Sequence, residues 1–324
     1  MAVSGLLLVA AGCSGGSGSS GPTATASTYS WSAPVHIEPA SLAADYDSLY
    51  GVSCPTSTFC MAVDVGGSAL TWNGHTWSAP HPTGSGGTLT SVSCATATDC
   101  VAMSAGGTAV AWDGTSWSSP VTVGPAGTFR VSCPTTTFCA ATGANGMAGA
   151  AGTLATYDGH AWSMQQTSST GATDDRLMDV SCANPTLCVA VNLDGSSLVF
   201  DGTGWSPVSS SVPRGTTSVS CPAGSTCLAV STSGSWSRFS GGSWSAPVVV
   251  PSLQGALASS LACSSANRCT AVGRSGRATS WRNGSWSHPT QVFHDGVSAT
   301  VDVSCAPVGP CLAVNSRGDA AVGA

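Results

Sequence analysis

Residues 91–120 read SVSCATATDCVAMSAGGTAVAWDGTSWSSP and contain four short runs of β-type residues separated by turn residues. The first run approaches Cys94, and a five-residue turn leads to a second run that begins at Cys100. Two glycines precede the third run, and an Asp-Gly pair precedes the fourth. Because four antiparallel strands joined by hairpins form one blade of a β-propeller, this stretch predicts a blade.

The same pattern occurs seven times along the chain. Each copy carries two cysteines separated by five residues, and successive copies start 39 to 49 residues apart. A period of about 40 residues with strand-type composition is typical of propeller blades. The sequence therefore predicts an all-β protein, a seven-bladed β-propeller of four-stranded antiparallel blades. The paired cysteines are Cys54/Cys60, Cys94/Cys100, Cys133/Cys139, Cys182/Cys188, Cys221/Cys227, Cys263/Cys269 and Cys305/Cys311.

Other positions keep a fixed distance from the second cysteine of each copy. Alanine stands two residues after it in all seven copies, and glycine stands seven residues after it in six. An aromatic residue and then a tryptophan follow in most copies. We interpret the alanine as permitting close approach of neighbouring blades and the glycine as permitting a positive φ in a turn. The aromatic residues are expected to fill the widening gaps between outer strands.

The seventh copy stops at Ala324 after its third run and lacks a fourth. The missing piece occurs at the other end of the chain, where residues 31–35 read WSAPV and match the fourth run of the fifth copy, residues 244–248. We therefore predict that an N-terminal strand at about residues 30–36 completes blade seven and closes the ring. Closure also removes sheet edges that an open ring would expose.

The cysteine pairs predict seven disulfides and an oxidising compartment, because a reducing cytosol does not sustain such bonds. Each disulfide would join the first two strands of a blade, where facing residues lie within disulfide reach. Zinc binding is the alternative, but a zinc site needs about four converging ligands, and each cysteine pair lies in a separate copy. No metal and no cofactor is therefore predicted.

The fifteenth cysteine, Cys13, ends the stretch MAVSGLLLVAAGC at residues 1–13. Its apolar run is too short to span a bilayer and fits a signal peptide. The ending Ala-Ala-Gly-Cys resembles a bacterial lipobox, which implies a lipid on Cys13. Alanine at residue 10 and the absence of Lys or Arg before the run depart from that pattern, so a secretory signal stays open. Residues 14–28 are rich in Gly and Ser and would tether a propeller of residues 29–324 to the bacterial cell membrane.

The stretch WNGHTW at residues 72–77 and its counterparts resemble the Asp-box turns of sialidase-like propellers, which end in Gly-x-Thr-Trp. The aspartates of this chain, where present, stand one position later than in that family, at Asp113, Asp158 and Asp201. The resemblance therefore implies a structural turn and not sialidase activity. The combined C-x5-C and W-[DN]-G-x-x-W-S-x-P pattern also resembles repeats in secreted actinobacterial proteins.

Charge is scarce, at 7% of residues, and all nine basic residues are arginine. Because a net charge of −6 with scattered arginines offers no basic stripe, nucleic acid is excluded as a partner. By analogy with other propellers, we expect a ligand at the face formed by the longer, more variable loops. The candidate ligand-binding residues there are Asp47, Tyr50, Asp64, Arg130, Asp179, Trp236, Arg274 and Asp302.

Three of these candidates also have plainer interpretations. Arg130 and Asp179 fall in neighbouring blades and can simply pair with each other. Trp236 stands where other copies have small residues, which makes it a candidate platform for stacking on a sugar ring with Tyr50. Local packing of Trp236 is the alternative.

No catalytic pattern emerges. Glycoside hydrolysis uses two carboxyl groups at a controlled separation, and the sequence, whose single glutamate is Glu38, shows no obvious pair of carboxyl residues. The G-x-S-x-G, HExxH and P-loop motifs are absent. We therefore expect a monomeric, surface-anchored, non-catalytic binding module for a glycan or an envelope protein. A glycan-active enzyme of the sialidase or glycoside hydrolase type and a purely structural scaffold are the alternatives.

Overall fold

The computed structural model describes residues 29–38, 48–144, 152–166, 176–250, 258–282, 284–294 and 301–324. The predicted signal peptide and tether, Cys13 and Asp47 lie outside the described residues. No described residue is helical, and no helix suited to crossing a membrane is found among them.

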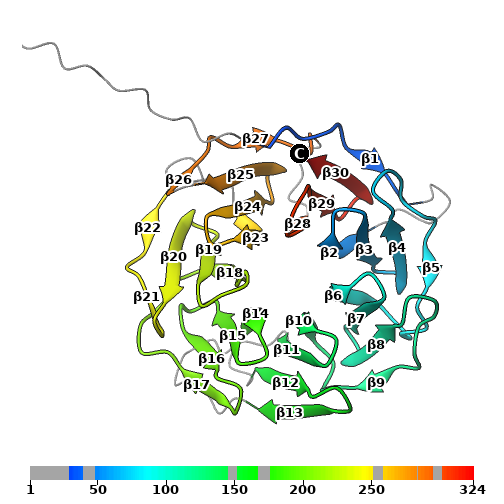
Figure 1. The fold of residues 1–324 in the computed structure, drawn as a ribbon, viewed down its shortest axis with the longest axis horizontal. Coiled ribbons are helices and arrows are strands. Elements are labelled where there is room, and N and C mark those ends of the chain that lie inside the picture. Colours follow the sequence, from blue (N-terminus) through cyan, green and yellow to red (C-terminus); the bar gives the residue numbers. More distant parts are fainter. Residues whose placement is uncertain are drawn as a thin grey trace, which may run out of the picture.

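Seven antiparallel sheets surround one axis, which confirms the predicted seven-bladed propeller (Figure 1). In each blade the first strand lies nearest the axis and the fourth lies at the rim. Blades five and six carry their outer strand in two pieces that pair with the same third strand. Blade one is formed by β2 (Leu49–Thr56), β3 (Phe59–Asp64), β4 (Ser68–Trp72) and β5 (His81–Pro82), and blade two by β6 (Leu89–Thr96), β7 (Asp99–Ser104), β8 (Thr108–Trp112) and β9 (Val121–Thr122). Blade three is formed by β10 (Thr128–Thr135), β11 (Phe138–Ala144), β12 (Thr153–Tyr157) and β13 (Trp162–Gln166). Blade four is formed by β14 (Leu177–Asn184), β15 (Leu187–Asn192), β16 (Ser197–Phe200) and β17 (Trp205–Pro207).

The remaining blades complete the circle. Blade five is formed by β18 (Thr216–Ser220), β19 (Cys227–Ser231), β20 (Ser235–Ser240), β21 (Ser243–Trp244) and β22 (Val248–Val249). Blade six is formed by β23 (Ala258–Ser265), β24 (Arg268–Gly273), β25 (Arg277–Arg282), β26 (Ser285–Trp286) and β27 (Thr290–Gln291). Blade seven is formed by β28 (Val301–Cys305), β29 (Cys311–Asn315), β30 (Asp319–Gly323) and β1 (Val35–His36).

The N-terminal strand closes the ring as predicted. β1 pairs antiparallel with β30, with Val35 opposite Ala320, and the two strands lie side by side in Figure 1. The pairing extends beyond β1, because the amide of Ser32 donates to the carbonyl of Val322 at 2.8 Å and that of Ile37 to Gly318 at 2.8 Å. Blade seven therefore joins strands from both ends of the chain.

All seven predicted disulfides are present, and in each the two Cα atoms lie 3.9–4.1 Å apart. Because each bridge closes a short loop, the chain-entropy model gives a stabilisation of about 2 kcal/mol for each. The bridges stiffen individual blades and do not link one blade to the next. The bonded pairs are Cys54–Cys60, Cys94–Cys100, Cys133–Cys139, Cys182–Cys188, Cys221–Cys227, Cys263–Cys269 and Cys305–Cys311.

The expectation that bonded cysteines face each other across the strand ladder needs a correction in three blades. The two cysteines are ladder partners in blades two, four, six and seven. In blades one and three the register shifts at Cys54 and Cys133, so Cys60 and Cys139 have no ladder partner on the first strand. In blade five Cys221 lies one residue beyond the end of β18. The bridge therefore tolerates an irregular hairpin, because it requires close Cα atoms and not a regular ladder.

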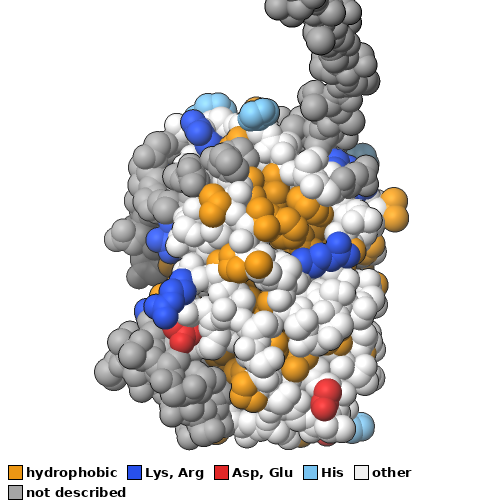
Figure 2. All heavy atoms as spheres, turned by 90° about the vertical axis from the view of Figure 1, so that its left-hand side faces the viewer, with side chains coloured by type: hydrophobic (Ala, Val, Ile, Leu, Met, Phe, Trp, Pro, Cys, Tyr) orange, Lys and Arg blue, Asp and Glu red, His pale blue; other side chains and the backbone are white. Residues whose placement is uncertain are grey.

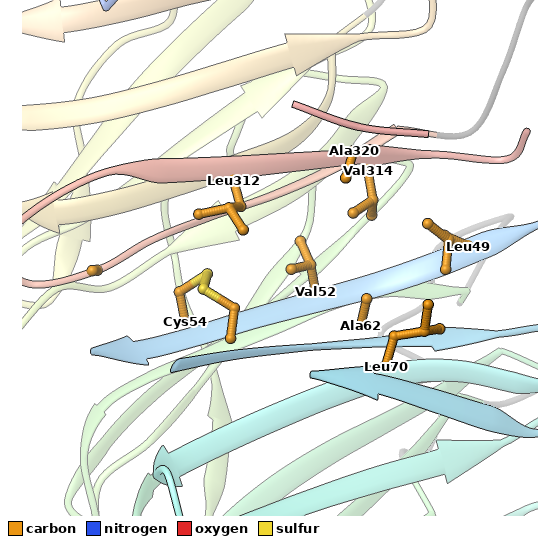
Figure 3. Packing of buried hydrophobic residues seen from close by; sticks show 10 residues of the cluster. Leu49, Val52, Cys54, Ala62, Leu70, Leu312, Val314 and Ala320 are labelled. Carbon is orange, nitrogen blue, oxygen red and sulfur yellow. A yellow bond between two sulfur atoms is a disulfide. The ribbon is translucent and has the colours of Figure 1, made fainter. Parts of the chain in front are cut away.

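The hydrophobic core is divided among the seams between blades. Between blades seven and one, Leu312, Val314 and Ala320 pack against Leu49, Val52 and Leu70 (Figure 3). The alanine two residues after each second cysteine is at most 2% exposed in every blade, as its predicted packing role requires. A larger side chain there would overpack the seam, at about 1–3 kcal/mol.

The glycine seven residues after the second cysteine adopts a positive φ in all six blades that have it at this spacing, from 71° to 97°. At Gly107 a Cβ atom would collide with the carbonyl oxygen of Gly124. The turn between the second and third strands therefore requires glycine for both its conformation and its packing.

Candidate axial site

Serine directly precedes the first cysteine in six of the seven blades. Each of these hydroxyls accepts a hydrogen bond from the backbone amide of the first cysteine in the next blade, at 2.9–3.0 Å. Blade six has Ala262 at this position, so no such bond reaches Cys305. We call this set of bonds the serine belt; its members are Ser53, Ser93, Ser132, Ser181, Ser220 and Ser304. It joins neighbouring inner strands that share no ladder hydrogen bonds.

A second layer, which we call the axial layer, lies two residues earlier on each inner strand. It contains Gly51, Ser91, Arg130, Asp179, Ser218, Ser260 and Asp302. In five blades its side chain accepts a hydrogen bond from an amide of the next blade, at 2.9–3.3 Å. Gly51 has no side chain to do so, and Arg130 carries only donors.

The two layers surround a cavity of about 220 Å³ on the propeller axis. Serine is the commonest residue of its lining, and the described residues that line it include no aromatic side chain. Three charged residues contribute to the wall, namely Arg130, Asp179 and Asp302. The axial channel is thus a polar cavity in which one guanidinium and two carboxyl groups converge from blades three, four and seven.

Asp179 fastens blade four to blade five. Its Oδ2 accepts from the Ser218 hydroxyl at 2.8 Å and from the Val219 amide at 2.9 Å, while Oδ1 accepts from the Val180 amide at 2.9 Å. Burial raises the pKa of Asp179 to about 6, although Arg130 and these hydrogen bonds act in the opposite direction. The residue keeps some exposed surface along the channel, but its carboxyl group lies deep among protein atoms.

Asp302 has the same role between blades seven and one. Its Oδ2 accepts from the Val52 amide at 2.9 Å, and its Oδ1 accepts from the Ser260 hydroxyl at 2.5 Å. Arg130 donates from Nη1 to the Thr90 carbonyl at 2.9 Å and acts on Asp179 as a nearby positive charge. Both carboxyl groups therefore accept hydrogen bonds from uncharged donors while they face a common cavity.

The structure brings together three of the predicted ligand residues, Arg130, Asp179 and Asp302. Tyr50 and Arg274 are not among the described residues that line the channel; Tyr50 is half-buried on β2, and Arg274 is exposed. Asp64 is 2% exposed, and its Oδ1 accepts from the Ser68 amide at 2.7 Å, so it caps a turn. Burial raises the pKa of Asp64 despite that hydrogen bond.

The second cysteine of each disulfide is placed away from the axial channel. These cysteines lie on the second strand of each blade, are at most 2% exposed, and are not among the described residues that line the channel. The first cysteines Cys263 and Cys305, in contrast, belong to its lining. The second cysteines therefore act as structural residues of the blade interior and not as ligand contacts of this channel. They are Cys60, Cys100, Cys139, Cys188, Cys227, Cys269 and Cys311.

Trp236 lies away from the axial channel. Its ring centroid is 4.6 Å from that of Trp281 and 6.4 Å from that of Trp286, in the seam between blades five and six. The structure therefore places Trp236 in packing between blades, which is the alternative to a sugar-stacking platform with Tyr50.

Sequence reasoning missed the serines of both layers. A signal for them was present, because Ser before the first cysteine recurs at the blade period and a polar residue stands two positions earlier in most blades. This spacing would have identified the side chains that cross from one inner strand to the next.

No family model matches the chain, and no curated protein matches it. Among solved structures, YCF48 bound to D1 peptide is similar at 14% identity, covering 94% of this chain and 99% of that one with a TM-score of 0.66. The WD40 β-propeller domain of Doa1 is similar at 11% identity over 93% and 97%, with a TM-score of 0.68. A catalytically inactive virginiamycin B lyase from Staphylococcus aureus with quinupristin is similar at 8% identity over 90% and 99%, with a TM-score of 0.72. At these identities the likeness shows the propeller fold alone.

Proposed function

We propose that the protein is a non-catalytic binding module that recognises a segment of an envelope protein at the mouth of its axial channel. The observation that carries this proposal is the convergence of Arg130, Asp179 and Asp302 on one cavity. The other blades present serine or glycine at the same position. Three charged groups gathered in a lining that is otherwise uncharged provide specificity for a partner of complementary charge.

The hydrogen bonds of the two carboxyl groups favour binding over catalysis. Both Asp179 and Asp302 hold an amide of the next blade, and a serine hydroxyl donates to each. A catalytic acid or base must instead exchange a proton with substrate atoms within hydrogen-bond reach. The raised pKa of Asp179 follows from its burial in the wall.

The dimensions and lining of the channel favour a protein side chain or peptide end over a sugar. Its volume of about 220 Å³ lies below the range of about 300–1,000 Å³ typical of small-molecule pockets. No aromatic platform for a sugar ring is present among its described lining residues. YCF48, which is similar in fold, is bound to a peptide in its structure.

The proposal places this module outside the cytoplasm as a monomer. Seven disulfides suit an oxidising compartment. A lipid on Cys13 would hold the propeller at the membrane, and without that lipid the protein would be secreted.

The test is selection of a displayed random-peptide library on the immobilised, oxidised protein. We expect enriched peptides whose dissociation constants rise at least tenfold with Arg130→Gln, Asp179→Asn or Asp302→Asn. Arg274→Gln, an exposed arginine that does not line the channel, is the matched control and should leave binding unchanged. Failure to enrich any peptide, or equal binding by all variants, would contradict the proposal. Glycan turnover lost with Asp179→Asn would restore the enzyme alternative.

A further inference from the structure

Blades one to six each hold an aromatic pair near the rim. In each, an aromatic residue at the end of the third strand packs against a tryptophan five residues later, with ring centroids 5.3–5.7 Å apart. The pairs are Trp72–Trp77, Trp112–Trp117, Tyr157–Trp162, Phe200–Trp205, Phe239–Trp244 and Trp281–Trp286. The same chemistry therefore recurs at the blade period around the ring.

Three consecutive seams are hollow in front of such a pair. Trp72 and Trp77 face β1 of blade seven across a groove of about 470 Å³. The pair of blade two faces β5 across about 540 Å³, and that of blade three faces β9 across about 440 Å³. We call these the rim grooves. In all three, both aromatic residues of the pair are partly exposed.

One position of the preceding blade explains why these seams are hollow. Nine residues after the second cysteine, blades seven, one and two carry alanine, and each of these alanines lines its groove: Ala320, Ala69 and Ala109. In blade five the same position is Trp236, which packs onto Trp281 of blade six. At these four seams alanine accompanies a hollow groove and tryptophan fills it, whereas Trp244 occupies the seam at Ser197 and Tyr29 the seam at Ala278.

The other seams are filled by further side chains. Phe138 stacks on Phe200 between blades three and four, with centroids 5.6 Å apart. Between blades four and five, Trp244 is buried and donates from Nε1 to the Ser197 hydroxyl at 2.9 Å. Between blades six and seven, Tyr29 is buried.

Figure 2 shows the side of the ring that carries β21, β22 and β26, where hydrophobic side chains gather and arginines lie at the border.

The rim grooves have the chemistry that recognises a sugar ring. An apolar aromatic surface lies beside polar groups of the turn that follows the third strand, such as Thr76, Ser116 and His160. Hydroxyl and imidazole groups both donate and accept hydrogen bonds, as sugar hydroxyls require. The described linings contain no arginine or glutamate, and Asp99 of the third groove is their one carboxylate. This lack of charge complements a neutral ligand, and the volumes fall in the usual pocket range of about 300–1,000 Å³.

We infer that the three rim grooves are equivalent subsites for a neutral polysaccharide of repeating sugar units. Sites repeated at the blade spacing match a ligand that is itself repeated. Linked engagement of several subsites raises avidity about 10²–10⁴-fold over a single one. The rim grooves lie outside the axial channel, so this inference stands independently of the peptide partner proposed there.

The experiment titrates the oxidised protein with neutral gluco-, manno- and galacto-oligosaccharides of one to eight units, and with the corresponding polymers, by calorimetry. We expect three sites per chain for a short oligosaccharide of one of these series and tighter binding of its polymer. Trp77→Ala, Trp117→Ala and Trp162→Ala should each reduce the number of sites from three to two, and the triple variant should bind none. Trp205→Ala removes the equivalent tryptophan from a filled seam and should leave three sites.

A second set of variants fills the grooves without removing their tryptophans. Ala320→Trp, Ala69→Trp and Ala109→Trp copy the arrangement of Trp236 and should each abolish one site. This set keeps the test decisive if a Trp→Ala variant fails to fold. No binding of any of the three neutral series, or equal weakening by Trp205→Ala, would overturn the inference. Binding that survives both the triple Trp→Ala variant and the three filling variants would also overturn it.

Discussion

Arg268 donates a hydrogen bond from Nε to the hydroxyl of Tyr29 at 2.9 Å, although 239 residues separate them in the chain. Tyr29 is 3% exposed in the seam between blades six and seven. The guanidinium of Arg268 also lies 5.3 Å from its ring centroid, and that of Arg282 lies 4.6 Å away. This is the seam at which Ala262 interrupts the serine belt, so Tyr29 reinforces the ring where an inner link is missing.

Tyr29→Ala should destabilise the propeller by about 3–5 kcal/mol, because it leaves a cavity in a buried seam and removes the hydrogen bond to Arg268. Tyr29→Phe keeps the ring and loses only the hydroxyl, so a smaller loss of about 1–2 kcal/mol is expected. Urea unfolding of the two variants measures both values. Equal losses for Ala and Phe would mean that the ring itself contributes nothing to the seam.

The serine belt can be tested by removing one of its hydrogen bonds and by adding the one that is missing. Ser181→Ala removes the acceptor of the Cys221 amide and should cost about 1–3 kcal/mol, because that amide is left unpaired near the axis. Ala262→Ser supplies the missing acceptor for the Cys305 amide and should add about 0.5–1.5 kcal/mol. Thermal unfolding of the oxidised variants measures both changes. A neutral or destabilising Ala262→Ser would show that the belt is not what joins the inner strands.

Asp179 should make stability depend on pH. Its folded pKa of about 6 exceeds its ordinary value of 3.8, so between these values the folded protein binds more protons than the unfolded chain. The stability contributed by protonated Asp179 is therefore present below about pH 4 and is lost as pH rises through about 6, on the order of 3 kcal/mol. Arg130 and Asp302 are the charged groups that act on it.

The comparison of wild type with Asp179→Asn isolates this effect, because Asn retains an acceptor oxygen for the Val219 amide. Urea unfolding at pH 4, 5, 6 and 7 should show wild-type stability falling relative to the variant. A constant difference across this range would exclude a raised pKa at Asp179. The variant also controls for other carboxyl groups, such as Asp201, whose pKa is lowered by hydrogen bonds from Thr203 and Gly204.

The fold was predictable because its determinants repeat at a fixed distance from the cysteines. The match between residues 31–35 and the other outer segments was sufficient to place β1 beside β30. The axial residues Arg130, Asp179 and Asp302 could be found for the same reason, since each stands three residues before a first cysteine. Position within the repeat translates directly into position around the axis.

Residues outside that register could not be assigned from sequence. Asp64 resembles a loop carboxylate but caps its own turn, a role that depends on the local backbone. The rim grooves depend on the contact between one blade's third strand and the next blade's aromatic pair. Ala69 and Trp112 are 43 positions apart, and both line one groove only because blades one and two are neighbours. The grooves therefore depend both on which blades are neighbours in the closed ring and on the volume of the side chains between them.

Trp236→Ala should open a fourth rim groove. The variant places alanine where Ala69, Ala109 and Ala320 leave their seams hollow, and it uncovers Trp281 and Trp286 of blade six. Loss of this half-buried side chain should cost up to about 3 kcal/mol, the lower end of the range for buried aromatic residues. If the rim grooves bind sugar, the calorimetric number of sites should rise from three to four. A loss of stability with the number unchanged at three would show that an aromatic pair and an alanine are not sufficient to form a subsite.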